Sequence, residues 1–334
     1  MENIIVTGGF GFIGLNLISY LTNLNKYTIH NIDNLSLGHS FFDHFLNTNQ
    51  KNQIKNYKED INNSTLITEI LEKYNITKVF HLAAESHVDR SISGPVSFFN
   101  SNVMGTLSLV ECCRKYITKK KKLDFKFLHI STDEVFGDLE VNDSSFNENT
   151  PYNPSSPYSS SKAASDFIIK SWCRTYNFPA IIINCSNNFG PAQNVEKFIP
   201  LSIDRLLNKK IMGIYGTGEN VRDWLFVEDH VKILNTIMLK GKVGETYCIG
   251  GKKELSNIEL FKTIHKIMKN VMQLDILPLD QSYSFVKDRL GHDYRYSVDV
   301  KKLTKDFNVN ITTNINEYLL KTIKFYSNLK KSKI

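Results

Sequence analysis

The stretch TGGFGFIG, residues 7–14, follows a short β-branched run at residues 3–7 and precedes an apolar helical pattern. Its glycines Gly8, Gly11 and Gly14 stand at G-x-x-G-x-x-G spacing. Glycine lets the backbone approach a pyrophosphate closely, and the helix that follows presents unpaired N–H groups and the positive end of its dipole. A tight turn without a ligand is the alternative. The position between a predicted strand and a predicted helix favours a dinucleotide-binding turn.

Alternating strand and helix patterns continue through the first half of the chain. Further strands are predicted at residues 28–32, 54–57, 78–82, 125–131 and 180–185, and a helix over residues 95–116. This alternation predicts an α/β fold with a Rossmann-like doubly wound parallel sheet. More frequent Gly and Pro turns from residue 187 predict a smaller mixed α/β substrate-binding lobe. We therefore expect a dinucleotide-binding domain at residues 1–186 and a mainly substrate-binding lobe at residues 187–334, with the chain crossing between them.

Two acids at predicted strand ends suit the adenosine part of a dinucleotide. Asp33 closes the second strand, where a carboxylate can accept hydrogen bonds from ribose hydroxyls. A carboxylate there disfavours a 2′-phosphate, and no arginine stands beside it, so the sequence predicts NAD rather than NADP. Asp60 closes the third strand and is either an adenine contact or an ordinary surface acid.

Composition narrows the partner classes. The 334 residues are 41% hydrophobic, enough for a sizeable core, and the net charge of +7 fits small anionic ligands. The densest basic run, residues 119–122, has no interleaved aromatics, so we expect a solvated loop and no nucleic-acid partner. The five cysteines lack C-x-x-C spacing and predict reduced thiols in a cytoplasmic protein. We expect no metal, no signal peptide and no membrane segment.

Tyr158 and Lys162 form a Y-x-x-x-K pair in a predicted helix. Residues four apart lie on one helix face, and an ammonium near a phenol favours the phenolate. The sequence therefore predicts a phenol with a lowered pKa that can act as a base. Together with the glycine turn, the pair resembles the extended short-chain dehydrogenase/reductase family. That resemblance implies that Thr132 completes a triad by hydrogen-bonding the reacting hydroxyl.

The stretch HISTDEV, residues 129–135, places Asp133 and Glu134 side by side where the fifth strand ends. Neighbours on an ideal strand point to opposite faces, so both acids can reach one substrate only if the backbone has turned by Asp133. We therefore expect irregular backbone there. Proximity and burial are expected to keep one carboxyl protonated and leave the other ionised, as an acid and a base. The alternative is that one acid only caps the next element.

Six longer stretches resemble the dTDP-glucose 4,6-dehydratase family, in the family's order and over nearly the whole chain. They are HLAAESHVDRS (81–91), STDEVFG (131–137), SNNFGP (186–191), EKFIP (196–200), YGTGENVRDWLFVEDH (215–230) and DRLGHDYRY (288–296). The related 4-epimerases usually lack both acids, and related decarboxylases have Glu without the preceding Asp. Two departures are Phe136, where Tyr is usual, and GPAQNVEKF, where GPYQFPEKL is usual.

The resemblance implies an NAD-dependent lyase that acts on a nucleoside-diphosphate glucose, with dTDP and UDP left open. Tyr158 and Thr132 assist oxidation at C4, Glu134 removes the C5 proton, Asp133 protonates the leaving C6 hydroxyl, and hydride returns to C6. The product is a 4-keto-6-deoxy sugar, which feeds rhamnose-type deoxysugar synthesis. The implied catalytic residues are Thr132, Asp133, Glu134, Tyr158 and Lys162.

The resemblance also implies the binding residues and a homodimer that pairs residues 95–116 and 160–176. The cofactor-binding residues are Gly8, Gly11, Phe12, Ile13, Gly14, Asp33, Asp60, Ile61, Ala83, Ala84, Tyr158, Lys162 and Asn188. The substrate-binding residues are Ser86, Thr132, Asn187, Lys197, Arg222, Asn257, Arg289 and His292. His87 is expected near the site without an assigned role. Two rivals are a UDP-sugar 4-epimerase on the same scaffold and a non-catalytic NAD-binding scaffold.

Overall fold

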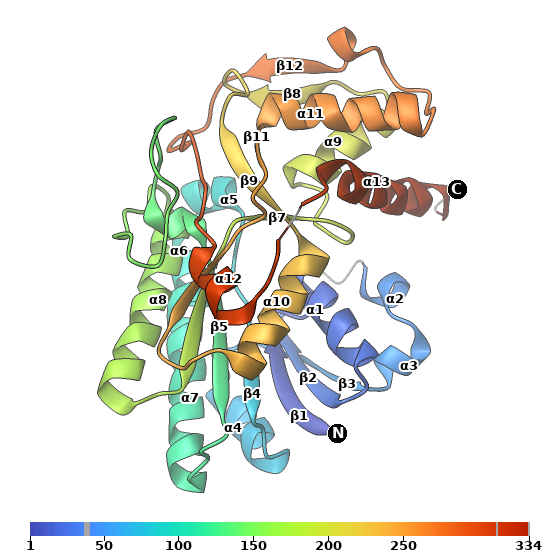
Figure 1. Ribbon diagram of the computed structural model, residues 1–334. Coiled ribbons are helices and arrows are strands. Elements are labelled where there is room, and N and C mark those ends of the chain that lie inside the picture. Colours follow the sequence, from blue (N-terminus) through green and yellow to red (C-terminus); the bar gives the residue numbers. More distant parts are fainter. Residues whose placement is uncertain (37–40, 312, 333–334) are drawn as a thin grey trace.

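A parallel sheet of seven strands forms the larger lobe of the computed structural model, which describes residues 1–36, 41–311 and 313–332 (Figure 1). The strand order is β10-β6-β5-β4-β1-β2-β3. The strands are β1 (Glu2–Thr7), β2 (Tyr27–Asp33), β3 (Ile54–Lys58), β4 (Lys78–His81), β5 (Lys126–Thr132), β6 (Ala180–Cys185) and β10 (Thr246–Ile249). The order reverses between β1 and β4, so the carboxyl ends of these two strands flank the crevice where ligands bind in such sheets.

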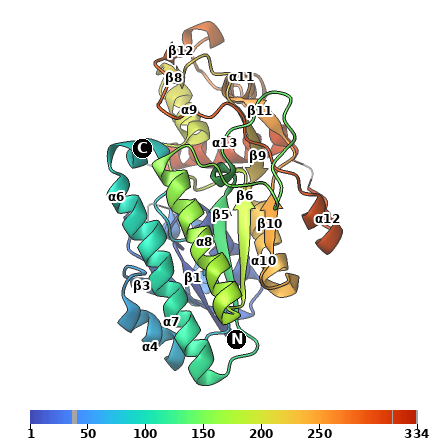
Figure 2. The same ribbon diagram turned by 90° about the vertical axis from the view of Figure 1, so that its left-hand side faces the viewer.

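Helices cover both faces of this sheet (Figure 2). One face carries α4 (Ser64–Lys73), α7 (Gly105–Lys120) and α8 (Pro157–Tyr176), and the other carries α1 (Phe12–Asn23) and α10 (Val227–Lys240). Side chains alternate across a strand. Accordingly Ile4 and Val6 of β1 lie in the core with α1 and α10, whereas Ile5 lies in the core with α4 and α7. The predicted doubly wound α/β fold is confirmed.

The predicted strands are all present, and their ends differ from the predicted ends by at most one residue. The helix predicted at residues 95–116 is built differently. It comprises α6 (Pro95–Phe98), a π-helical segment η1 (Phe99–Met104) and then α7. The π-helical segment contains the fully buried Asn102, whose Nδ2 donates to Ser161 Oγ over 2.8 Å and to Glu85 O over 3.0 Å. Such segments often occur at functional sites.

The smaller lobe lies at the top of Figure 1 and has its own core. It contains the mixed sheet β11-β9-β7 and the parallel pair β12-β8, with helices α9, α11 and α13. The bounds are β7 (Asn187–Phe189), α9 (Phe198–Leu207), β8 (Met212–Tyr215), β9 (Val221–Phe226), β11 (Glu254–Ser256), α11 (Asn257–Lys266), β12 (Tyr283–Val286) and α13 (Ile315–Ser332).

Short elements connect these parts of the chain. The α-helical ones are α2 (Phe42–Phe45), α3 (Thr48–Lys51), α5 (Val88–Ser93) and α12 (Lys301–Phe307). The others are η2 (Asp133–Phe136), η3 (Ile267–Val271) and η4 (Leu279–Gln281). The described helices include none with the length and apolar character that crossing a membrane requires.

The chain returns to the larger lobe after entering the smaller one. Strand β10 pairs in parallel with β6, with Thr246 opposite Ile182, and α10 packs against α1 on the sheet. The chain then runs back into the smaller lobe, where it forms α11 and α13. The functional division at residues 186 and 187 stays a prediction.

Candidate active site

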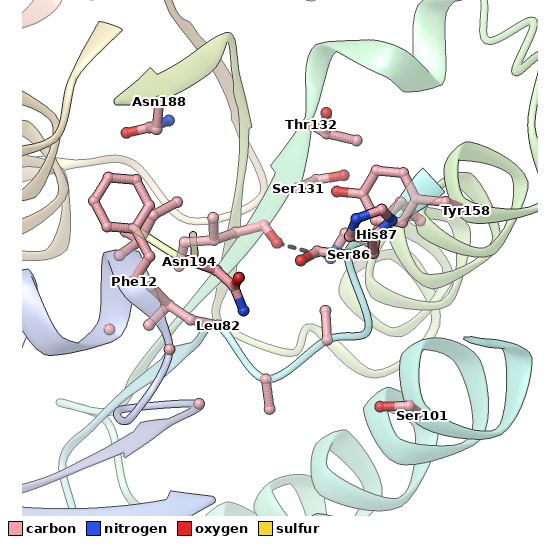
Figure 3. Close-up of a pocket in the computed structure, with 18 of the residues that line it drawn as sticks. Phe12, Leu82, Ser86, His87, Ser101, Ser131, Thr132, Tyr158, Asn188 and Asn194 are labelled. Carbon is pink, nitrogen blue, oxygen red and sulfur yellow. Dashed lines mark hydrogen bonds between the residues drawn. The ribbon is translucent and has the colours of Figure 1, made fainter. Parts of the chain in front are cut away.

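A cavity of about 290 Å³ lies at the carboxyl ends of the larger sheet, between the two lobes (Figure 3). Most of the residues that the sequence singled out line it. They are Gly8, Gly11, Phe12, Ile13, Gly14, Asp33, Asp60, Ile61, Ala83, Ala84, Ser86, Thr132, Asp133, Glu134, Tyr158, Lys162, Asn187, Asn188 and Lys197. In Figure 3, Phe12 and Asn188 lie on one side of the cavity, and Thr132 and Tyr158 lie on the other.

The glycine turn after β1 has room only for glycine at two of its positions. Gly8 has φ +72°, and a Cβ there would lie 2.7 Å from the backbone nitrogen of Ala83, just beyond β4. A Cβ on Gly14 would lie 2.1 Å from the carbonyl oxygen of Gly8. Glycine at these positions therefore lets the start of α1 pack directly against the strand ends.

Asp33 has a structural function that sequence reasoning missed. Its carboxylate accepts hydrogen bonds from the backbone N–H of Phe10 over 3.0 Å and of Leu35 over 2.8 Å. Burial raises the pKa of Asp33, and these two hydrogen bonds oppose the rise. The same side chain thus lines the cavity and holds the glycine turn in place. Asp60 is held in a similar way by Asn34 Nδ2 and by the backbone and side chain of Asn62.

The backbone turns at Asp133, as predicted. Thr132 is still extended, with φ −136°, and the short 3₁₀ helix η2 begins at Asp133. The Thr132 hydroxyl accepts a hydrogen bond from the Glu134 N–H and donates one to Asp133 Oδ1, both over 3.3 Å. Asp133 is 1% exposed, and within the described residues its Oδ2 has no hydrogen-bond partner. Both acids line the cavity.

The two acids differ in their electrostatic surroundings. Burial raises the pKa of Asp133 well above its ordinary value, and the carboxylates of Glu134 and Asp223 raise it further. Burial also raises the pKa of Glu134, but the cations Arg289, Arg222 and Lys197 oppose that rise. Asp133 therefore keeps its proton more firmly, and Glu134 ionises first. One neighbour can donate a proton while the other accepts one.

The Tyr158–Lys162 pair enters the cavity from α8, which begins with a capping box formed by Ser156 and Ser159. Lys162 is 4% exposed, and its Nζ donates to the carbonyl oxygen of Ile130 over 2.8 Å. Burial raises the pKa of Tyr158 well above its ordinary value, Glu134 raises it further, and Thr132 opposes the rise. The expectation that Lys162 lowers the pKa of the Tyr158 phenol is therefore wrong for the chain without a bound ligand, because burial has the largest effect on this pKa.

The smaller lobe contributes a cation to the cavity. Lys197, at the start of α9, lines it and donates a hydrogen bond to the carbonyl oxygen of Ser86 over 2.9 Å. Four other predicted substrate residues are not among the lining residues of the cavity: Arg222, Asn257, Arg289 and His292.

Arg222 and His292 already have partners within the chain. The guanidinium of Arg222 donates to the carbonyl oxygens of Val221, Asp293 and Tyr294. His292 Nδ1 lies 2.6 Å from Asp288 Oδ1. By contrast, the buried Nε of Arg289 has no hydrogen-bond partner in the described ranges.

The cavity also has lining residues that sequence reasoning left out. They include Ser131, Cys185, Ser186, Gln193, Asn194 and Glu196. His87, which the sequence placed near the site without a role, also lines the cavity. Glu196 accepts two hydrogen bonds from Arg90 Nη2, over 2.7 and 2.6 Å, and its Oε2 lies 3.6 Å from His87 Nε2. The signal that could have found these residues is their position within or next to the motif stretches at 81–91, 131–137, 186–191 and 196–200.

A doubly wound sheet, a glycine turn after β1 and a Tyr–Lys pair facing the same cavity are the arrangement of the short-chain dehydrogenase/reductase class. Comparison with known proteins narrows the class. The family model described as GDP-mannose 4,6 dehydratase matches residues 5–322. A dTDP-glucose 4,6-dehydratase of Haemophilus influenzae is 43% identical over 338 residues, which cover 98% of each chain. These matches show that the chain belongs to the nucleotide-sugar 4,6-dehydratase family, among the dTDP-glucose 4,6-dehydratases.

Solved structures agree with this assignment. The dTDP-glucose 4,6-dehydratase of Bacillus anthracis in complex with NAD has 34% sequence identity and a TM-score of 0.85, and the match covers 99% of this chain and 98% of that one. The dTDP-glucose 4,6-dehydratase of Streptomyces venezuelae, also with NAD bound, has 32% identity and a TM-score of 0.88 over the same shares of the two chains.

Proposed function

We propose that the protein is an NAD-dependent 4,6-dehydratase that converts a nucleoside-diphosphate glucose to the 4-keto-6-deoxy sugar. The adjacency of Asp133 and Glu134, which line one cavity with different electrostatic surroundings, carries the proposal. Eliminating water across C5 and C6 needs a base for the C5 proton and an acid for the C6 hydroxyl. The product would feed rhamnose-type deoxysugar synthesis.

The residues around the glycine turn fit NAD. The first intrahelical bond of α1 runs from the Leu15 N–H to the carbonyl oxygen of Gly11, so the N–H groups of residues 12–14 are available to a pyrophosphate. Asp33 suits the adenosine ribose, Asp60 and Ile61 suit the adenine, and the Ala83 backbone packs closely against Gly8 at the edge of the cavity. Ala84, Tyr158, Lys162 and Asn188 complete the proposed cofactor site. NAD held by these residues would supply a hydride acceptor for C4 and, once reduced, a hydride donor for C6.

The chain's own residues supply the proton transfers. Tyr158, hydrogen-bonded to the substrate together with Thr132, takes the proton of the C4 hydroxyl. The resulting C4 ketone makes the C5 proton acidic, and Glu134 removes it. Asp133 donates its proton to the C6 hydroxyl, which leaves as water. The proton held by Glu134 then returns to C5 as C6 takes up the hydride. Lys162 favours the phenolate that this step requires, and the positively charged nicotinamide ring of NAD would favour it further, against the effect of burial.

Cations of the smaller lobe suit the substrate's diphosphate. We propose Lys197 and Arg289 as direct contacts, because Lys197 lines the cavity and the Arg289 Nε is buried without a partner among the described residues. An arginine fork binds phosphate oxygens bidentately. The remaining residues of the proposed substrate site are Ser86, Asn187, Arg222, Asn257 and His292.

Incubation of the purified protein with dTDP-glucose tests the proposal. A 4-keto-6-deoxy product without net formation of NADH is expected, and mass spectrometry would record the loss of one water. Parallel kinetics on UDP-glucose would identify the preferred base. Thymidine is the first choice because the relatives are named for it. A product that keeps its C6 hydroxyl would support the 4-epimerase instead, and NAD binding without turnover would support a non-catalytic scaffold.

We also propose that the protein is a homodimer in the cytoplasm. Large apolar side chains are exposed on the segments 95–104 and 157–176: Val96, Phe99, Met104, Phe167 and Tyr176. These segments and α7 lie on one side of the molecule in Figure 2. The cysteines are free thiols, which suits a reducing compartment. Sedimentation analysis of the wild-type protein and of Phe99→Asp would test the dimer, which the variant is expected to weaken.

A further inference from the structure

A cluster of buried polar side chains lies between α8 and the ends of β5 and β6. Its centre is Asp166, which is fully buried. Asp166 Oδ2 accepts hydrogen bonds from Ser131 Oγ over 2.9 Å, Tyr152 OH over 2.9 Å and Asn184 Nδ2 over 3.2 Å. Asp166 Oδ1 lies 3.1 Å from His129 Nε2. A buried carboxylate with this many partners is a built feature of the fold.

This cluster holds three consecutive residues at the end of β5. Lys162 bonds the carbonyl oxygen of Ile130 over 2.8 Å. Asp166 bonds the hydroxyl of the next residue, Ser131, over 2.9 Å. Asn184 donates to both Asp166 Oδ2 and the carbonyl oxygen of Thr132, the latter over 3.1 Å. The strand end that presents Thr132 is thereby fastened to the helix that presents Lys162.

The ammonium of Lys162 needs a buried counter-charge, and Asp166 is the group that can supply it. An uncompensated buried ammonium is strongly disfavoured. Burial lowers the pKa of both His81 and His129, and burial raises the pKa of Cys185 to about 12, so these three neighbours are uncharged near neutral pH. Asp166 lies one helical turn after Lys162 on α8 and raises the pKa of that lysine against the effect of burial.

Other groups near Asp166 leave it ionised. Burial acts to raise the pKa of Asp166, but the contacts with His129, Lys162 and Ser131 outweigh burial and lower it. Tyr152 stays protonated because burial and Asp166 raise the pKa of its phenol. Lys170 lies one turn further along α8, and Asp166 also raises the pKa of this lysine against the effect of burial.

We propose that Asp166 is a positioning residue for the proton transfer at Tyr158: its carboxylate keeps Lys162 charged and fastens the end of β5 to α8. This rests on the proposed function for the identity of the reaction, but the Asp166–Lys162 relationship belongs to the chain alone. Asp166 does not line the cavity and acts only through Lys162 and β5.

The variant Asp166→Asn removes the charge and can keep the shape. Its amide oxygen can accept from Ser131, Tyr152 and Asn184, and its amide N–H can donate to His129 Nε2. That nitrogen becomes an acceptor when the imidazole proton moves to Nδ1, which has no partner within the described residues. In this variant Lys162 is expected to lose its proton at a pH lower by about one unit or more.

Two measurements follow the charge of Lys162. The first is a ¹³C NMR titration of lysine Cε, with the Lys162 signal assigned from Lys162→Met. The second is the pH profile of kcat, whose alkaline limb is expected to move down by the same amount, so that lowering the pH restores activity. Tyr152→Phe removes one hydrogen bond but leaves the charge, and it should move neither. An unmoved lysine titration in a folded Asp166→Asn protein would overturn the proposal.

A third measurement tests the proposal even if the Asp166→Asn variant does not fold. Urea unfolding of Asp166→Asn, Lys162→Met and the double variant forms a double-mutant cycle. If Asp166 is the counter-charge of Lys162, the double variant should lose less stability than the two single variants lose together. Where Asp166→Asn does not fold, the double variant should fold. Additive losses, or a double variant that is also unfolded, would contradict the proposal. The titration and this cycle need no substrate, so they stand whichever sugar the protein uses.

Discussion

The Nζ atom of Lys197, at the start of α9 in the smaller lobe, donates a hydrogen bond to the carbonyl oxygen of Ser86 in the larger lobe over 2.9 Å. The same ammonium lowers the pKa of Glu134, together with Arg289 and Arg222, against the effect of burial. One side chain therefore ties the lobes together at the cavity and favours the ionised form of the proposed base.

Replacing Lys197 by Met should shift the pH dependence of catalysis. Without the ammonium the pKa of Glu134 rises, and Glu134 acts as a base only when ionised, so the acid limb of kcat moves to higher pH. A shift of several tenths of a unit to about one unit is expected from a profile between pH 5 and 9. Lys232→Met, which breaks an exposed ion pair with Asp229, should leave the limb in place. If the acid limb does not shift in Lys197→Met, the charge of Lys197 does not affect the ionisation of Glu134.

Asp133→Asn and Glu134→Gln should stop the reaction at different points. Each is expected to lower kcat by about 100-fold or more, the usual contribution of a general acid or base. With Asp133→Asn, Glu134 can still remove the C5 proton, so in D₂O the sugar should gain deuterium at C5 without losing water. With Glu134→Gln the exchange should be lost as well. Mass spectrometry of the recovered nucleotide sugar measures both, and equal exchange in the two variants would contradict the assignment.

Asp223 should make the protein less stable as the pH rises. Burial raises its pKa from 3.8 to about 6, although the N–H groups of Lys253 and Gly251 oppose that rise. The stability that this acid contributes is present below pH 4 and is lost as the pH rises through 6. That loss amounts to about 3 kcal/mol. Asp223→Asn lacks this dependence, so its stability relative to wild type should increase by a similar amount between pH 4 and 7.

Urea unfolding at several pH values checks this prediction. The amide of Asp223→Asn can accept only one of the two backbone hydrogen bonds with its single oxygen, which lowers stability by about 1 kcal/mol at every pH. Only the pH-dependent part of the difference therefore reports the carboxyl group. Parallel stability curves for the two proteins would show that Asp223 ionises with an ordinary pKa.

Local sequence patterns predicted the sheet well, because each central strand is a short apolar run. The run at residues 3–7 alternates between two buried faces, and its end is marked by Gly8. The turn at Asp133 was also predictable, since two adjacent acids cannot both continue a strand toward one ligand. These features depend on neighbours within a few residues.

Features that depend on distant residues could not be predicted in this way. The carboxylate of Asp223 in β9 raises the pKa of Asp133 at the end of β5, although the two residues lie 90 positions apart in the sequence. The raised pKa of Tyr158 reflects the loss of water around its phenol in the cavity, whereas the Y-x-x-x-K pattern shows only the nearby ammonium. Strand β10 joins the larger sheet from beyond residue 240, and its four residues TYCI carry too little pattern to indicate which sheet it enters.

Comparing Gly14→Ala with Gly11→Ala should show whether the turn needs glycine for its close packing or only for its backbone flexibility. A Cβ at residue 14 would lie 2.1 Å from Gly8 O and 2.8 Å from Gly9 Cα, backbone atoms that cannot rotate away, whereas at residue 11 the nearest atom is 3.1 Å away. Alanine otherwise favours a helix by about 1 kcal/mol, so a loss at Gly14 reports the clash. We expect Gly14→Ala to lose about 1–3 kcal/mol of stability and most NAD affinity, and Gly11→Ala to lose little stability. Denaturation and calorimetric NAD titration measure both, and equal effects would mean that the turn has more room than its geometry indicates.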